Sequence, residues 1–188
     1  VLRSHTRVAR IIDKGPGRGA LVVTERKVTD ETTGELLATI EHTSFCRADG
    51  GIGRSDESLP PLTATPETPP DLSVSLPTVS QSALLYRLNG DLNPIHVDPV
   101  AARTAGFDRP ILHGLCTYGM ACRAILRACC DNDPARLASF SLRFSAPFFP
   151  GDTLRVDIWR EGNQVRFQGV SQATQTRVLS HGNAELRA

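Results

Sequence analysis

A short polar turn, GDLNPIHVDP at residues 90–99, holds the residues of this chain that are best suited to chemistry. Asp91 and His96 stand five positions apart, with Asn93 between them and Pro94 stiffening the turn. A carboxylate and an imidazole on a non-helical turn can converge on one water molecule. An amide can orient either group, because it both donates and accepts hydrogen bonds. Two acid/base groups with an orienting amide suit proton transfer at carbon.

A second feature, His113-Gly114, stands at the start of the longest predicted helix, residues 115–130. A glycine at a helix N-terminus offers an unobstructed backbone N–H at the positive end of the helix dipole, which suits a developing oxyanion. Together with Asp91 and His96, this donor indicates enolate-type chemistry beside a carbonyl group. We interpret His113 itself as a hydrogen-bonded turn residue.

Other polar or reactive residues have a structural interpretation. Asp98 precedes Pro99, so we expect it to cap a short helix over 99–105 rather than to bind a metal ion with His96. Trp159 is expected to pack in a sheet rather than to stack on a ligand. The five cysteines are odd in number and lack CxxC spacing, so we expect buried thiols and neither a disulfide framework, a zinc site nor a nucleophile: Cys46, Cys116, Cys122, Cys129 and Cys130.

Two strand-rich regions flank the helices that must position these groups. Stretches rich in Val, Ile and Thr, separated by turn sequences, predict antiparallel strands at 5–13, 19–29, 35–46, 138–149, 152–161, 164–172 and 176–186. Helix signals predict further elements at 81–88, after Ser80 as a cap, and at 99–105 and 115–130. The two strand-rich regions share a plan, which indicates related halves of an α+β fold with an antiparallel sheet around a central helix.

Composition excludes several classes of protein. The 188 residues are 40% hydrophobic and 22% charged, with a net charge of +1. This composition is typical of a globular domain and shows no excess of positive charge that would indicate binding to nucleic acid or to a membrane surface. No apolar run approaches the roughly 18 residues that span a bilayer, and no signal peptide is evident. We therefore expect a cytoplasmic protein. The chain begins at Val1 without Met, which suggests a processed or partial sequence.

Residues 86–119, YRLNGDLNPIHVDPVAARTAGFDRPILHGLCTYG, resemble the hydratase 2 motif of the MaoC-like, hot-dog-fold family of (R)-specific 2-enoyl-CoA hydratases. The matching positions are Tyr86, Gly90, Asp91, Asn93, Pro94, His96, Asp98, Pro99, Ala102, Gly106, Phe107, Pro110, Ile111, His113 and Gly114. The region 1–50 is similar to the degenerate first hot-dog of two-domain members. The resemblance implies a double hot-dog with an incomplete or degenerate half at 1–48, an extended linker at 49–78 and a catalytic hot-dog at 79–188.

The same resemblance implies a hydro-lyase that adds water to trans-2-enoyl-CoA and forms (R)-3-hydroxyacyl-CoA. It implies that Asp91 and His96 activate the water, that Asn93 is the supporting amide, and that the Gly114 N–H binds the thioester oxygen. No metal ion or redox cofactor is implied, because the thioester is itself the electron sink. A homodimer of double hot-dogs is the expected assembly.

Two further positions resemble substrate-binding residues of the family. Phe144 lies in LRFSAPFFPG, and Lys14 in IIDKGPGRG is suited to a phosphate or the adenine region of CoA. In two-domain members a helix and an opening strand of the first half would precede Val1. The chain is therefore either a fragment or a protein with a reduced first half, and acyl-chain length stays open.

Two alternatives remain open at the level of sequence. One keeps the chemistry and changes the substrate, as in a 3-hydroxyacyl-carrier-protein dehydratase or a mesaconyl-type CoA hydratase. The other is a non-catalytic hot-dog subunit that binds acyl-CoA. The presence of both Asp91 and His96 makes this second alternative the weaker one.

Overall fold

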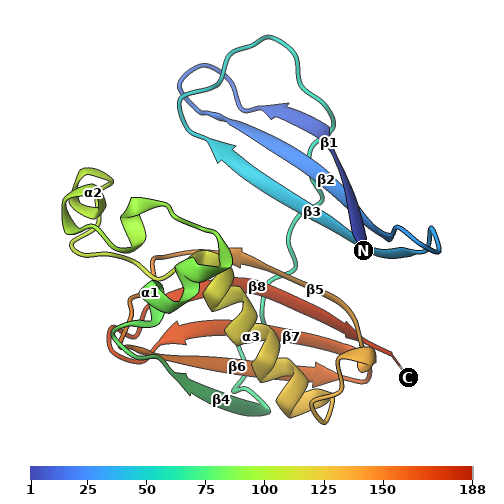
Figure 1. Ribbon diagram of the computed structural model, residues 1–188, viewed down its shortest axis with the longest axis vertical. Coiled ribbons are helices and arrows are strands. Elements are labelled where there is room, and N and C mark those ends of the chain that lie inside the picture. Colours follow the sequence, from blue (N-terminus) through green and yellow to red (C-terminus); the bar gives the residue numbers. More distant parts are fainter. Residues whose placement is uncertain (188) are drawn as a thin grey trace. The chain divides into compact units, whose positions relative to one another are not determined.

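The computed structural model describes residues 1–187, and the chain divides into two compact units, residues 1–61 and 62–188 (Figure 1). The first unit is a three-stranded antiparallel sheet in the order β1-β2-β3, formed by β1 (Leu2–Asp13), β2 (Ala20–Asp30) and β3 (Leu36–Cys46). This confirms the predicted meander. The structure describes every residue of this unit, and none of them is helical.

The second unit combines a five-stranded antiparallel sheet with one long helix, which is a hot-dog arrangement. The strand order is β4-β6-β7-β8-β5, and α3 (Gly114–Cys129) lies across one face of the sheet (Figure 1). The strands are β4 (Leu72–Pro77), β5 (Leu137–Phe144), β6 (Thr153–Glu161), β7 (Gln164–Ser171) and β8 (Arg177–Leu186). A 3-10 turn, η3 (Pro134–Arg136), leads from α3 into β5.

Strand β4 corrects the predicted linker. We placed residues 49–78 in an extended linker, but 72–77 pair in antiparallel register with β6, so that Val74 faces Val156 and Leu76 faces Leu154. Alternation of apolar residues with serine is typical of a strand with one buried face. The prolines around this stretch concealed the short alternating pattern.

Short helical segments fill the region between β4 and α3. They are α1 (Ser82–Tyr86), η1 (Arg87–Asn89), η2 (Pro94–His96) and α2 (Pro99–Thr104). The N-cap of α1 is Gln81 and makes no side-chain capping bond, so the prediction of a Ser80 cap is wrong. Asp98 does cap α2 as predicted, because its carboxylate accepts a hydrogen bond of 2.7 Å from the Val100 N–H.

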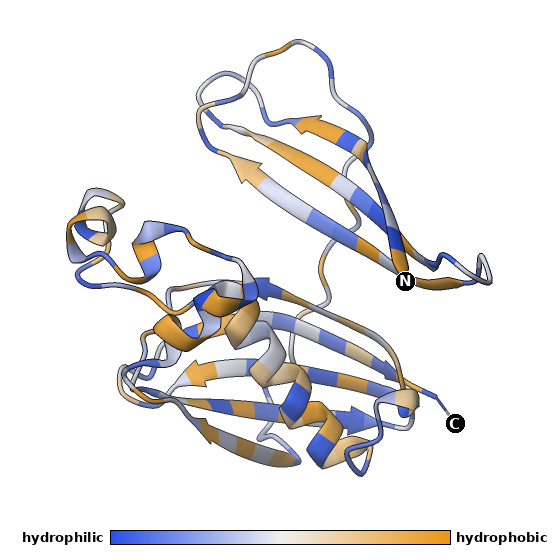
Figure 2. Cartoon of the chain, in the orientation of Figure 1, coloured by the Kyte–Doolittle hydropathy of each residue, from blue (hydrophilic) through white to orange (hydrophobic). Residues whose placement is uncertain are grey.

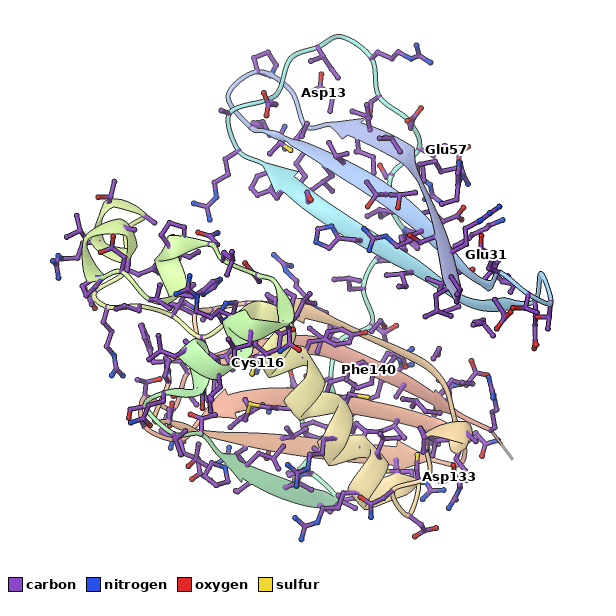
Figure 3. The ribbon with its side chains drawn as sticks, in the orientation of Figure 1. Asp13, Glu31, Glu57, Cys116, Asp133 and Phe140 are labelled. Carbon is purple, nitrogen blue, oxygen red and sulfur yellow. The ribbon has the colours of Figure 1, made fainter. Side chains whose placement is uncertain are left out.

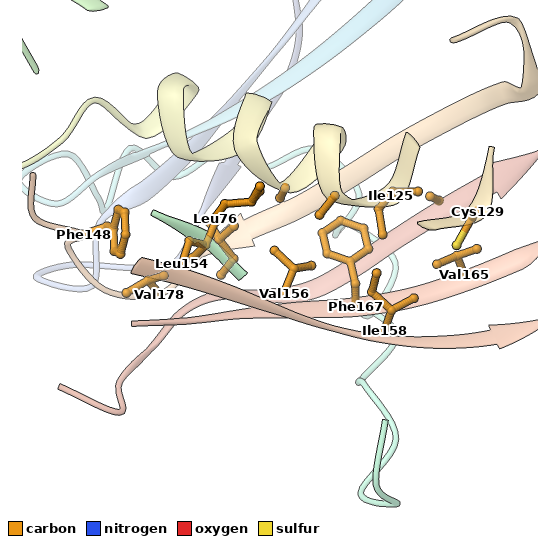
Figure 4. Packing of buried hydrophobic residues seen from close by; sticks show 14 of the residues in the cluster. Leu76, Ile125, Cys129, Phe148, Leu154, Val156, Ile158, Val165, Phe167 and Val178 are labelled. Atoms are coloured by element: carbon orange, nitrogen blue, oxygen red, sulfur yellow. The ribbon is translucent and has the colours of Figure 1, made fainter. Parts of the chain in front are cut away.

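The core of the second unit lies between α3 and the sheet. Ala121, Ala124 and Ile125 repeat at helical spacing and are fully buried. They belong to one cluster with Val156 and Phe167, and Ile125 of α3 lies beside the ring of Phe167 (Figure 4). Fully burying an aliphatic or aromatic side chain contributes about 1.5–3 kcal/mol each. Along most of β6 and β7, hydrophobic and hydrophilic residues alternate, as a sheet with one face on the core requires (Figure 2).

The cysteines and Trp159 follow the structural interpretation. All five cysteines are free, Cys129 and Cys130 are buried in the core, and Cys116 extends from the first turns of α3 (Figure 3). Burial raises the pKa of the Cys116 thiol. Trp159 is buried on the sheet, and its indole N–H donates to the carbonyl oxygens of Thr68 and Pro69 at 2.9 and 3.1 Å. No helix in the described part of the chain is long and apolar enough to cross a membrane.

Candidate active site

The polar turn is fixed by hydrogen bonds between its own residues. Gly90 ends η1 with a positive φ of 101°, a conformation that glycine adopts at little cost. The Asn93 N–H then donates to the Asp91 carboxylate at 3.2 Å, and the Asn93 side-chain oxygen accepts from the Ile95 N–H at 3.3 Å. Asn93 therefore connects the carboxylate to the short helix that ends at His96. The contact with Asp91 comes from the Asn93 backbone and not from its side-chain amide, so the predicted orienting role of the amide stays a prediction.

His96 is buried, and one of its two ring nitrogens is hydrogen-bonded to the backbone. Its Nδ1 lies 2.8 Å from the carbonyl oxygen of Ile111. Because a carbonyl oxygen only accepts, Nδ1 carries the hydrogen and the neutral ring has its free lone pair on Nε2. The backbone of Ile111 thus sets which nitrogen of His96 can exchange a proton with a ligand.

Asp91, His96 and His113 form one cluster. Each residue offers a carboxylate oxygen or ring nitrogen that lies within 4.8 Å of those of the other two, and Asp91 is exposed while both histidines are buried. Two acid/base groups at this separation can act on the same molecule directly or through one water. The structure therefore brings together Asp91 and His96, as the sequence predicts.

The same three residues could also be considered as metal ligands. The hydrogen bonds do not exclude that use, because they occupy only His96 Nδ1 and His113 Nε2 and leave a lone pair on the other nitrogen of each ring. The absence of a metal ion from the working protein stays a prediction.

His113 makes more contacts with other residues of the site than the sequence predicts. It is hydrogen-bonded, as predicted, with Nε2 at 3.2 Å from the carbonyl oxygen of Asp91. Its ring also stacks on that of His96, with centroids 3.8 Å apart and planes 24° from parallel, and it lies 4.8 Å from the ring of Tyr86. These contacts were not predicted. The only signal for them was that His113 and Tyr86 belong to the matched motif.

Burial changes the acid–base properties of the two residues beside the pair. The pKa of His113 is lowered, chiefly because burial disfavours the charged ring, although the hydrogen bond to Asp91 opposes this. The pKa of Tyr86 is raised, first by burial and then by Cys116 and Asp91 nearby. Both side chains are therefore held in their neutral forms at the back of the site.

Gly114 and Phe144 meet at the start of α3. Gly114 is the first residue of the helix and is exposed, so its N–H is one of the donors that the helix itself leaves unpaired. A Cβ added at Gly114 would lie 3.4 Å from two ring carbons of Phe144, whose side chain is 48% exposed at the end of β5. The predicted oxyanion donor and one predicted substrate contact are thus neighbours.

Lys14 lies in the first unit, just after β1. Its ammonium group stands over the ring of Phe45, 5.3 Å from the centroid, which is within cation–π range. The turn is also held by Asp13, whose carboxylate accepts from the Gly15 and Gly51 N–H groups at 2.8 Å each. The predicted contact between Lys14 and CoA stays a prediction.

Comparison with known proteins supplies the family context. The family described as "MaoC like domain" matches residues 61–181. The chain is 40% identical over 190 residues to peroxisomal multifunctional enzyme type 2 of Drosophila melanogaster, covering 100% of this chain and 31% of that protein. It is 41% identical over 180 residues to enoyl-CoA hydratase ChsH3 of Mycobacterium tuberculosis, covering 96% of this chain and 62% of that one.

A solved structure agrees with this result. The crystal structure of a MaoC-like dehydratase from Phytophthora capsici superimposes with a TM-score of 0.92 at 35% identity, covering 99% of this chain and 64% of the other. The chain therefore spans about a third of the Drosophila relative and less than two thirds of the other two proteins.

Proposed function

Because the chain belongs to the MaoC-like family, we propose that it catalyses the reversible (R)-specific hydration of trans-2-enoyl-CoA to (R)-3-hydroxyacyl-CoA. The observation that carries the proposal is the convergence of the Asp91 carboxylate and the His96 ring, beside the helix N-terminus at Gly114. Two relatives named as enoyl-CoA hydratase and MaoC-like dehydratase support the same class of reaction, a hydro-lyase.

In the proposed mechanism, one water molecule lies between the Asp91 carboxylate and His96 Nε2. One of the two groups removes a proton from the water as its oxygen bonds to the β-carbon. That proton is then delivered to the α-carbon, so that the elements of water are added across the double bond and both groups return to their starting protonation states. Negative charge gathers on the thioester oxygen, and the Gly114 N–H at the positive end of the α3 dipole stabilises it.

The substrate contacts are proposed from the same surroundings. Phe144 is half exposed beside Gly114, so its ring can pack against the acyl chain next to the thioester. Lys14 is proposed to bind a phosphate or the adenine of CoA. The thioester withdraws electrons from the double bond, so the reaction as proposed needs neither a metal ion nor a redox cofactor.

The wider organisation is also part of the proposal. The helix-free sheet of residues 1–61 is proposed to be the degenerate or incomplete half of a double hot-dog, and two copies of the double hot-dog are proposed to form a homodimer. A cytoplasmic location stays a prediction, and the Drosophila relative is named as peroxisomal.

Incubation of the protein with trans-2-enoyl-CoA tests the proposed reaction. The conjugated-thioester absorbance should fall and the product should be the (R) isomer. Asp91→Asn and His96→Asn should each lower kcat on the order of 10²–10⁴-fold, the usual contribution of a proton-transfer group. Asp98→Asn is the matched control, because it removes a neighbouring carboxylate that caps α2 and keeps a capping oxygen.

Three outcomes would contradict the proposal or redirect it. An (S) product or undiminished turnover in Asp91→Asn would overturn the mechanism. Faster turnover of the same acyl group on carrier protein than on CoA would favour the dehydratase alternative. Binding of acyl-CoA without turnover by the unmodified protein would favour the non-catalytic subunit.

A further inference from the structure

His113 contacts more parts of the site than any role assigned to it so far explains. It donates from Nε2 to the backbone of Asp91, and it packs face to face with His96 at 3.8 Å. It is also the N-cap residue of α3, so the next residue is Gly114, and the Thr117 hydroxyl donates to its carbonyl oxygen at 3.3 Å. One fully buried residue thus contacts the backbone of Asp91 and the ring of His96, and it directly precedes the predicted oxyanion donor.

The hydrogen bonds also fix which form of the ring is present. The partner of Nε2 is a carbonyl oxygen, so Nε2 must carry the hydrogen. In the neutral ring, Nδ1 is then a bare acceptor, and it is buried with no hydrogen-bond partner among the described residues. A proton on Nδ1 would place an unpaired N–H and a positive charge in this buried position against His96, so the ring stays neutral.

The unpaired nitrogen shows that stability alone does not explain a histidine here. A phenylalanine would fill the same space without an unpaired buried acceptor, and buried polar groups in proteins are nearly always paired. What phenylalanine cannot do is donate to Asp91 while presenting a ring face to His96. The combination of a donor and a stacking face is the property that histidine supplies at this position.

We infer that His113 is a positioning residue, whose Nε2–H holds the backbone of Asp91 while its ring seats His96, so that both groups reach the same substrate atoms beside Gly114. This inference rests on the proposed hydratase function and adds a residue to it. His113 itself exchanges no proton with the substrate. Its effect is geometric, and misplacing a reacting group by about 1 Å can cost a hundredfold in rate.

Substitutions at His113 separate the donor from the ring. In His113→Gln the side-chain amide can place an N–H near the position of Nε2, whereas His113→Phe keeps a ring and loses the donor. We expect the Gln variant to keep kcat on enoyl-CoA within about tenfold and the Phe variant to lose on the order of 10²-fold, with KM changed less than threefold in both. His181→Asn is the control, because Asn tolerates the left-handed backbone at that partly buried histidine.

The outcomes of the kinetics are decisive in either direction. A loss of kcat in His113→Phe but not in His113→Gln supports the positioning role. Full activity in the Phe variant, or equal loss in both variants with unchanged thermal unfolding, would overturn it. A change confined to KM would also overturn it, because the contact would then serve substrate binding.

A second measurement needs neither activity nor a substituted protein. Two-bond ¹⁵N–¹H correlation spectra of the unmodified protein report which nitrogen of each histidine ring carries the hydrogen. We expect His113 with hydrogen on Nε2 and His96 with hydrogen on Nδ1. Hydrogen on His113 Nδ1 would refute the inferred contact even if hydration is observed. The expected tautomers in a protein that does not hydrate enoyl-CoA would leave the geometry intact and reject only the proposed reaction.

Discussion

At the scale of single residues, adding one carbon atom at Gly114 is expected to impair the reaction and to leave the stability of the fold unchanged. The residue begins α3, and the space beside its α-carbon is bounded by the ring of Phe144 at ordinary van der Waals distance. Leu115, the next residue of the helix, is 64% exposed. Gly114 and Leu115 at the start of α3 are therefore exposed, whereas Thr117 in the same turn is buried and the later turns pack on the core.

Gly114→Ala should preserve the fold and impair the reaction. The methyl group fits 3.4 Å from Phe144 without a clash, but it occupies the approach to the Gly114 N–H. We expect kcat/KM to fall at least about tenfold, with unfolding temperature unchanged or higher. Gly119→Ala, in the same helix with nothing within 4 Å of the added carbon, is the control and should gain about 0.5–1 kcal/mol in stability at full activity. Equal activity of the two variants would contradict the oxyanion role.

The neutral state of His113 predicts a pH dependence of stability. Its folded-state pKa is lowered below the ordinary value of 6.5 by burial, with His96 and Arg87 adding to the effect and Asp91 opposing it. Between these two pKa values the unfolded chain binds a proton that the folded chain does not, so the free energy of unfolding decreases as pH falls below about 6.5. Above that pH the residue makes no difference between the two states.

Denaturant unfolding from pH 7.5 to pH 5 measures this contribution. The decrease attributable to His113 has a limit of about 1.4 kcal/mol per pH unit, and His113→Gln should remove it while keeping the other titrating groups. If the free energy of unfolding changed with pH in the same way in the unmodified protein and in His113→Gln, His113 would be protonated in the folded state.

At the scale of elements, the cap of α2 was predictable from the sequence, whereas the predicted Ser80 cap of α1 was wrong. Gly90 and Asp98 act within one or two residues of their own position, so local chemistry predicts their effect. The contact between His113 and Asp91 joins residues 22 positions apart and depends on how α3 packs on the sheet. No local pattern contains that information, which is why the sequence predicted the acid/base pair but missed the residue behind it.

The role of Gly182 in β8 is a second feature that a local sequence pattern cannot predict. The pairing of β7 with β8 shifts register between Phe167 and Gly169, and at Gly182 an added Cβ would lie 2.4 Å from the Phe167 carbonyl oxygen and 2.5 Å from its ring. The sequence shows only a glycine within a strand. The structure shows that the close approach of two backbones requires it.

Gly182→Ala should therefore destabilise the second unit. The methyl group must displace the backbone of β7 and the fully buried Phe167, and we expect a loss of about 1–3 kcal/mol in urea unfolding. Ala184→Gly, which removes a buried methyl two residues along the same strand, provides a comparison in which atoms are lost instead of added. An unchanged unfolding midpoint in Gly182→Ala would show that β7 and β8 are less closely packed than described.

At the scale of the whole molecule, the two units differ in how much apolar surface they bury. The second unit contains one continuous core of buried side chains between α3 and the sheet. The first unit buries Ile12, Ala20 and Val23 and leaves larger residues such as Ile40 and Phe45 about half exposed. The second unit also carries the whole acid/base cluster. The sequence predicted strands without a helix in the first unit and strands around a long helix in the second, although it assigned β4 to the linker. That the first unit is an incomplete hot-dog stays a prediction.

The choice of hydrogen-bond partners has a consequence for how this site withstands mutation over evolutionary time. His96 and His113 are both oriented by main-chain carbonyl oxygens, those of Ile111 and Asp91. A carbonyl oxygen is present whatever side chain a codon specifies, so drift at position 111 changes packing without removing the bond that sets the His96 tautomer. The orientation of both rings therefore depends on the path of the backbone at positions 91 and 111 and not on the side chains there.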